Sequence, residues 1–145
     1  MIVTVKHNFE TAHRLPFLPG KCQSIHGHSW QVEWSFDQDM DENGLTLEYG
    51  VMKRELRDWV DTYLDHGTML GEDDKLLEAF RQDGSKVFVF GANLAAENLP
   101  WPTVEAVAKV LARVAYVQVS SAITCVYVQE TAVNSAIWSY AADGL

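Results

Sequence analysis

A stretch of seven residues, Cys22 to His28, concentrates the groups in this sequence that could carry chemistry. It holds one thiol and the imidazoles of His26 and His28, and a third imidazole, His13, lies shortly upstream. Side chains alternate in direction along an extended segment, so both rings of a His-x-His sequence point to the same side. Three imidazoles from two strands can fill three corners of a tetrahedral zinc site, and an open fourth corner is the catalytic arrangement. The spacing therefore predicts a Zn2+ site at His13, His26 and His28.

Cys22 leaves three interpretations open. As a fourth ligand it would close the site into a structural one, whereas as a thiolate beside the cation it would be a base. As a small buried residue it would only fill the core, but its place in a loop with Pro16, Pro19 and Gly20 argues against that. Alternatively, the three histidines could form only ordinary hydrogen bonds. Their positions on the apolar faces of two predicted strands argue against this alternative.

Two alternating segments must position these groups. Residues 2–13 and 28–36 alternate apolar and polar side chains, as half-buried strands do, and the histidines continue their apolar faces. Apolar residues recur at helical spacing in two later segments, residues 52–64 and 104–115. The remaining pattern predicts a short helix at 74–82 and strands at 86–90, 122–128 and 137–140. We therefore expect one α+β domain over residues 1–145, with two helices on one face of a four-stranded antiparallel sheet. The first two and the last two of these strands would form the sheet, and 86–90 would lie in the connection between the helices.

Composition excludes several classes of protein. The formal net charge of −9 argues against nucleic-acid binding, which needs a basic patch. Two cysteines in 145 residues do not indicate a disulfide scaffold and favour a reducing compartment. The first residues alternate rather than forming a signal peptide, and no apolar run is long enough for a membrane helix. The sequence therefore predicts a soluble, cytoplasmic protein.

Three further polar positions carry weaker signals. Asp65 and His66 end the first predicted helix, where a histidine is electrostatically favourable whether or not it has a chemical role. Glu105 could simply pair with Lys109 one helical turn later. Glu130 is different, because it continues an apolar strand face, and a carboxylate in that position needs hydrogen-bond donors. A ligand with several adjacent N–H groups would supply them.

Five short motifs stand in order along the chain: Phe9–Leu15, Cys22–His28, Leu64–His66, Pro102–Glu105 and Glu130–Thr131. Together they resemble the 6-pyruvoyl-tetrahydropterin synthase superfamily, which includes the bacterial 6-carboxy-tetrahydropterin synthases of the queuosine pathway. The resemblance covers about 120 residues, in the order of the family's motifs. There are departures: Leu47–Gly50 stands where the family usually shows Asp-Phe, Met69–Gly71 replaces Leu-Asn, and the connection 67–101 is longer than in compact members.

The resemblance implies the tunnelling fold, in which subunits join their sheets into barrels and the site lies between chains. We expect a homo-oligomer, a hexamer built as a dimer of trimers. The resemblance also implies that Cys22 is the catalytic base, with Asp65 and His66 as its partners, and that Glu130 anchors the pterin. Further residues are implied near the substrate: Thr131, Thr103 and Glu105 at the pterin, and Arg14 and Lys21 as candidates for the anionic tail.

The implied reaction is that of a zinc-dependent lyase acting on 7,8-dihydroneopterin triphosphate. Three residues separate Cys22 from His26, which resembles the bacterial queuosine-branch enzymes; the animal-type pyruvoyl synthases have a longer separation. We therefore expect a 6-carboxy-5,6,7,8-tetrahydropterin synthase that releases acetaldehyde and triphosphate. The alternatives are a 6-pyruvoyl-tetrahydropterin synthase, which only eliminates triphosphate, and a non-catalytic zinc- or pterin-binding protein.

Overall fold

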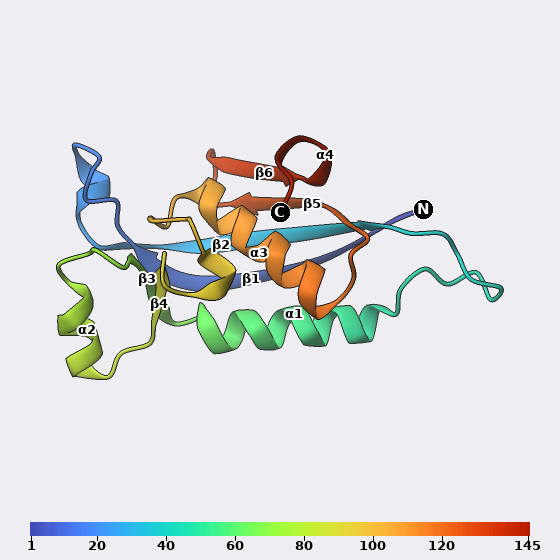
Figure 1. Cartoon of the computed structure of the whole chain (residues 1–145), viewed down its shortest axis with the longest axis horizontal. Coiled ribbons are helices and arrows are strands. Elements are labelled where there is room, and N and C mark those ends of the chain that lie inside the picture. Colours follow the sequence, from blue (N-terminus) through green and yellow to red (C-terminus); the bar gives the residue numbers. More distant parts are fainter.

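Two twelve-residue strands, β1 (Ile2–His13) and β2 (His26–Asp37), form a long antiparallel hairpin in the computed structural model of residues 1–145 (Figure 1). Their alternating burial matches the predicted half-buried strands, because apolar side chains of both face the core. β5 (Ile123–Gln129) pairs with β2, and β6 (Ser135–Ser139) pairs with β5, both antiparallel. The predicted strands at 122–128 and 137–140 are thus confirmed, the second beginning two residues earlier.

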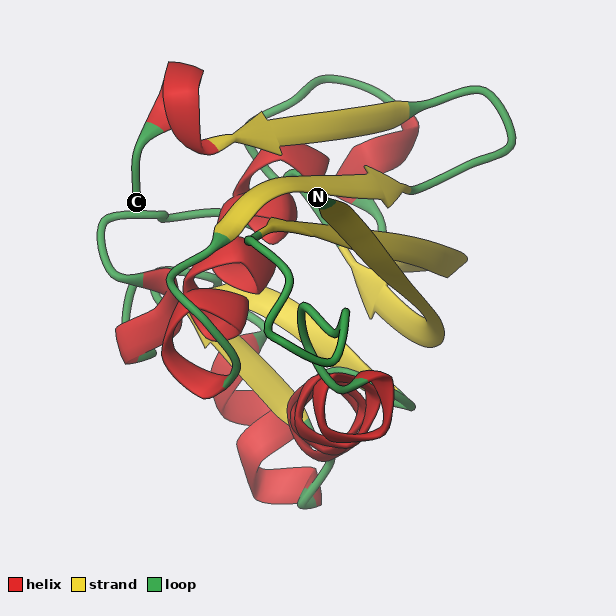
Figure 2. Cartoon of the chain, turned by 90° about the vertical axis from the view of Figure 1, so that its right-hand side faces the viewer, coloured by secondary structure: helices red, strands yellow, loops and turns green.

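The prediction of a four-stranded, wholly antiparallel sheet is wrong. The sheet has six strands in the order β4-β3-β1-β2-β5-β6, because β3 (Gly67–Gly71) and β4 (Val87–Phe90) extend it in parallel beyond β1. β3 escapes detection because four of its five residues are buried, so it shows no alternation of apolar and polar side chains. The α+β class is confirmed, and the sheet curves into a half-barrel (Figure 2).

Two long helices cover the apolar face of the sheet, as predicted (Figure 1). α1 (Tyr49–Tyr63) begins at Glu48, whose side chain accepts a hydrogen bond from the Gly50 amide. α3 (Val104–Gln118) begins at Thr103, whose hydroxyl caps the Ala106 amide. Such caps fix where a helix starts, because its first amides have no partner within the helix.

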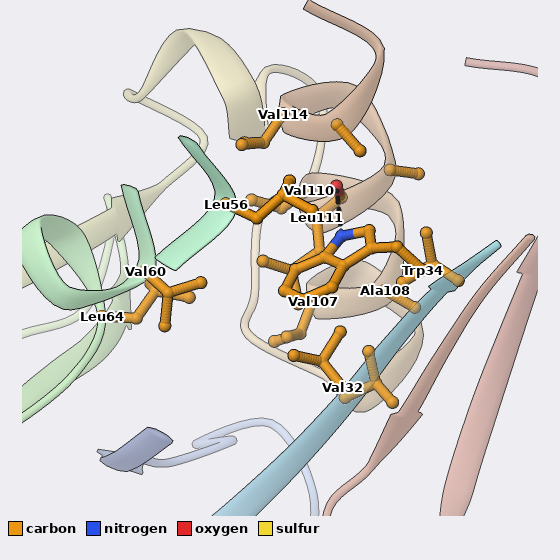
Figure 3. Close-up of a cluster of buried hydrophobic side chains, with 14 of the residues drawn as sticks. Val32, Trp34, Leu56, Val60, Leu64, Val107, Ala108, Val110, Leu111 and Val114 are labelled. Carbon is orange, nitrogen blue, oxygen red and sulfur yellow. Dashed lines mark hydrogen bonds between the residues drawn. The ribbon is translucent and has the colours of Figure 1, made fainter. Parts of the chain in front are cut away.

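Helices and sheet meet in one apolar core. Trp34 of β2 lies against α3 and donates its indole N–H to the Leu111 carbonyl oxygen at 3.2 Å (Figure 3). Leu56 and Val60 of α1 approach the same cluster from the side (Figure 3). This packing holds the β1–β2 hairpin rigidly, which matters because the histidines lie at its far end.

The remaining elements are short. The predicted short helix is confirmed as α2 (Leu77–Asp83), which begins later than expected because Asp74 closes a turn by accepting a hydrogen bond from the Leu76 amide. None of the helices is both long enough and apolar enough to span a bilayer. The other short elements are η1 (Lys21–Gln23), η2 (Leu94–Ala96) and α4 (Tyr140–Asp143).

Candidate metal centre and surrounding residues

The β1–β2 hairpin brings three imidazoles together. His13 pairs with His26 across the two strands, and His28 pairs with Thr11, so all three rings lie on one side of the sheet. Their candidate ligand nitrogens lie within 4.8 Å of one another. The ring centroids are 4.7 to 5.2 Å apart. The prediction that these residues form a candidate metal site is therefore confirmed.

Hydrogen bonds to backbone carbonyls orient two of the rings. The Nδ1 atom of His13 donates to the Pro102 carbonyl oxygen at 2.8 Å, and that of His26 donates to Ser24 at 2.8 Å. A carbonyl only accepts, so each Nδ1 carries the proton and each Nε2 presents a lone pair in the neutral ring. The buried Nε2 atoms of His13 and His28 have no hydrogen-bond partner. Buried polar nitrogens without partners are costly, and metal-binding histidines have this arrangement, with the second nitrogen held by an acceptor.

Burial lowers the pKa of two of the three imidazoles and so favours their neutral form. Desolvation is the largest of the effects that together lower the pKa of His13 to about 4. The Pro102 hydrogen bond opposes it in part, and the neighbouring His26 and His28 rings add to it. Burial also lowers the pKa of His28, with His26 adding to the effect. Neutral imidazoles are the form that binds a metal, so the residues fit a divalent cation.

Cys22 is not part of this ligand group. It lies in η1, half-buried, and its carbonyl oxygen accepts a hydrogen bond from the Leu15 amide at 2.7 Å. The geometry thus gives three protein ligands rather than four, which is the pattern of catalytic and not of structural zinc sites.

Glu130 follows directly after β5 and lies against the histidines. Its Oε1 atom is 3.3 Å from the His13 Nε2 atom, and 17% of its side chain is exposed. Burial raises the pKa of Glu130; His26 lowers it, and Glu105 raises it again. A carboxylate in this position lacks donors from the chain itself, as the sequence predicted.

Asp65 and His66 form a hydrogen-bonded pair just after α1. The His66 Nδ1 and Asp65 Oδ2 atoms are 2.6 Å apart, and the other Asp65 oxygen accepts from the Glu10 amide at 2.8 Å. His66 has a positive φ of 54° and an exposed ring. The His66 amide donates to the Glu10 carbonyl oxygen of β1, whereas the Leu15 amide, two residues beyond the end of β1, donates to the Cys22 carbonyl oxygen. Cys22 and this pair are thus attached at different points of the chain.

The hydroxyls of Thr103 and Thr131, which the resemblance places near the pterin, already accept hydrogen bonds from nearby backbone amides. Thr103 caps α3, and the Thr131 hydroxyl accepts from the amides of Val133 and Asn134 in the β5–β6 turn. Glu105 is exposed in the first turn of α3 and forms no ion pair with Lys109 in the structure. Thr103 and Glu105 line one wall of a cavity of about 520 Å³, which is not lined by the histidines.

Arg14 is not free to bind an anion. Its Nε atom donates to the buried Asp74 carboxylate at 2.8 Å, so an acidic side chain already neutralises this candidate for the triphosphate. Lys21, the second candidate, is exposed. The sequence analysis did not identify Asp74, although the acidic run Glu72–Asp74 between two structured segments was a visible signal. The carbonyls of Ser24 and Pro102 gave no sequence signal, because every residue has one.

Comparisons with known proteins agree with this geometry. The sequence matches the family "6-pyruvoyl tetrahydropterin synthase" over residues 2–140. A 6-carboxy-5,6,7,8-tetrahydropterin synthase of Rickettsia typhi is 29% identical over 99 residues, covering 66% of this chain and 72% of the relative. The enzyme of the same name from Rickettsia bellii is 31% identical over the same length and with the same coverage.

Solved structures show the same fold. An uncharacterized protein from Wolinella succinogenes superposes with a TM-score of 0.72 at 16% identity, covering 96% of this chain and 98% of the other. The 6-pyruvoyl tetrahydropterin synthase of Caenorhabditis elegans gives a TM-score of 0.65 at 23% identity, covering 96% of both chains. With the family match across nearly the whole sequence, these findings show that the chain belongs to the 6-pyruvoyl tetrahydropterin synthase family.

Proposed function

We propose that the protein is a zinc-dependent 6-carboxy-5,6,7,8-tetrahydropterin synthase acting on 7,8-dihydroneopterin triphosphate. The observation that carries the proposal is the open three-histidine centre with a carboxylate, Glu130, beside it. Three nitrogen ligands with a vacant fourth corner suit Zn2+ in a hydrolytic or lyase role. The curated relatives named for this activity support the choice of reaction.

Each residue then has a defined task. His13, His26 and His28 would hold the zinc, which when bound supplies Lewis-acid polarisation of substrate hydroxyls. Cys22, as the thiolate, takes a carbon-bound proton from the side chain of the substrate. Glu130 accepts the N–H groups of the pterin's guanidine-like edge, and these donors compensate the burial of its carboxylate.

The remaining site residues act on protons and on placement. The Asp65–His66 pair relays protons to and from the base, because the carboxylate holds the ring in one orientation. Thr103, Glu105 and Thr131 border the pterin, with the two threonine hydroxyls stabilising the turns that carry them.

The proposed overall reaction balances with one water. The bond between the first two side-chain carbons breaks, the carbon–oxygen bond to the triphosphate breaks, and the oxygen of water ends in the new carboxyl group. Oxidation of that carbon is matched by reduction of the pterin ring from the dihydro to the tetrahydro level. The products are 6-carboxytetrahydropterin, acetaldehyde and triphosphate, and no external oxidant or reductant is needed.

The test is incubation of the zinc-loaded protein with 7,8-dihydroneopterin triphosphate, with an acetaldehyde trap and mass analysis of the pterin. Both acetaldehyde and the carboxy-pterin are expected, and neither should form with Cys22→Ala. Triphosphate release with an intact pyruvoyl side chain would identify a 6-pyruvoyl-tetrahydropterin synthase instead. Tight pterin binding without any product would identify a binding protein.

We also propose that the working form is a closed homo-oligomer, a hexamer made of two trimers. The unpaired outer edge of β6 supports it, since a strand of a neighbouring chain can pair with that edge. The partners are thus further copies of this chain and a small pterin triphosphate.

A further inference from the structure

A buried ion pair joins two distant segments beside the metal centre. The Arg14 Nε atom lies 2.8 Å from Asp74 Oδ2, and the side chains are only 10% and 0% exposed. Arg14 directly follows the ligand His13, whereas Asp74 lies in the turn between β3 and α2. Asp74 is itself held in place, because its other oxygen accepts a hydrogen bond from the Leu76 amide at 2.9 Å.

The turn that carries Cys22 has few contacts of its own. η1 is a single turn of three residues with no buried side chain and no side-chain cap. On one side it borders a cavity of about 580 Å³, whose lining is polar apart from Pro16 and includes Gln23, Ser24 and Asp73. Hydrophobic packing therefore does not fix the turn from that side.

Arg14 connects the ion pair to this turn. Its Nη1 atom lies 3.4 Å from the Gln23 carbonyl oxygen, while the next residue, Leu15, donates its amide to the Cys22 carbonyl at 2.7 Å. In Figure 1 both η1 (light blue) and α2 lie at the end of the sheet farthest from the N terminus. His13, Arg14 and Cys22 thus lie within ten residues of one another in the sequence, and Arg14 contacts both Asp74 and the turn that carries Cys22.

We infer that Arg14 and Asp74 are a positioning pair that fixes the Cys22 turn relative to the three histidines. The inference rests on the proposed function, in which the Cys22 thiolate must reach a carbon-bound proton of a substrate held at the metal. Asp74 belongs to the 67–101 connection, so this connection helps to form the site although it supplies no ligand. Neither residue touches the reacting atoms.

The decisive variant replaces both partners, Arg14→Met with Asp74→Leu, so that no unpaired charge is left buried. It is made in a Cys125→Ser background, which leaves Cys22 as the single thiol. The matched control makes the same changes at an exposed ion pair of α1, Arg54→Met with Glu55→Leu. Four quantities are measured: zinc content, iodoacetamide alkylation of Cys22, hydrogen exchange of residues 20–24, and kcat with KM.

We expect the double variant to keep its zinc and its KM, while kcat falls on the order of 10²-fold because the base is misplaced. Alkylation of Cys22 and hydrogen exchange of residues 20–24 should become several-fold faster, with the control unchanged in all four measurements. Unchanged kcat, alkylation and exchange in the folded double variant would overturn the inference.

A second variant decides the matter if the double variant does not fold. Arg14→Lys keeps a charge for Asp74, but its single ammonium group cannot also donate to Gln23 in the same geometry. Alkylation of Cys22 should then be faster than in wild type, and an unchanged rate would overturn the inference. A wild-type protein that forms no product would refute the proposed function instead, since alkylation and exchange report on the turn without turnover.

Discussion

At the scale of single residues, the centre depends on which nitrogen of each histidine carries a proton. The carbonyls of Pro102 and Ser24 fix that choice for two rings, leaving their Nε2 lone pairs for a cation. We predict that His26→Ala and His28→Ala lose most of their zinc, measured by elemental analysis. His7→Ala is the control, because His7 binds Asp61 at 3.2 Å outside the centre and should keep full metal content. Full zinc in both ligand variants would contradict the site.

We predict that Cys22 is needed for turnover but not for binding of the metal. Its position outside the three-histidine group predicts that Cys22→Ala keeps its zinc. Loss of a general base lowers turnover by roughly 10²–10⁴-fold. Elemental analysis and product assay of the same sample test both expectations, and loss of metal in proportion to activity would favour a four-ligand structural site.

Asp65 gives a prediction on pH. Burial alone raises its pKa, but hydrogen bonds from the Glu10 amide and from His66 outweigh that effect and leave the pKa lowered. The folded-state pKa then lies below the unfolded value of about 3.9, so the ionised carboxylate stabilises the fold above that pH and loses this effect as pH falls. Asp65→Asn should be less stable than wild type to urea at pH 7, with a smaller difference below pH ~4. A stability difference between Asp65→Asn and wild type that does not change with pH would contradict this prediction. The control is Asp58→Asn, because Asp58 is exposed on α1.

At the scale of elements, the sequence predicts the strands and helices whose apolar residues recur at regular spacing. It does not predict elements that lack such spacing. β1, β2, α1 and α3 follow from alternation or helical spacing, and the histidines follow from their phase with two strands. β3 does not follow, because it is short, almost wholly buried, and paired in parallel with residues more than fifty positions away. The Arg14–Asp74 pair is missed for the same reason, since it depends on that long-range pairing.

The last residue of β3, Gly71, lies close to the segment that leads into α3. A Cβ atom on Gly71 would lie 2.5 Å from the Pro100 carbonyl oxygen and 2.6 Å from the Trp101 ring. This close approach places the following Pro102, whose carbonyl holds His13. We predict that Gly71→Ala destabilises the fold by about 1–3 kcal/mol through overpacking and weakens zinc binding.

Thermal unfolding and zinc titration check this prediction against Gly27→Ala. A Cβ atom on Gly27 would meet only the Thr11 carbonyl oxygen, at an ordinary 3.7 Å. The control should therefore unfold near the wild-type temperature. Equal behaviour of the two variants would show that Pro102 does not depend on the close approach at Gly71.

At the scale of the whole molecule, one chain leaves sheet edges unpaired. β6 has no neighbour on its outer side, and β3 pairs with β1 only at Thr11 to His13, so most of β1 also has a free edge. Ile137 of β6 is 64% exposed. Free edges promote aggregation unless they are paired or covered, and edge-to-edge joining around a rotation axis removes both.

The last prediction tests whether neighbouring chains share the site. Within one chain, Cys22 is held at Leu15 and the Asp65–His66 pair at Glu10. We expect a complete site to combine Cys22 from one chain with His66 from the next. Cys22→Ala and His66→Ala should each be inactive alone. If they are unfolded together and reassembled in equal amounts, about one quarter of the sites combine two intact halves, so about one quarter of wild-type activity should return.

The control mixes Cys22→Ala with a double variant that carries both Cys22→Ala and His66→Ala. This mixture contains no intact Cys22 and should stay inactive. Light scattering should show assemblies larger than one chain, and mixed oligomers without recovered activity would place the whole site within a single chain.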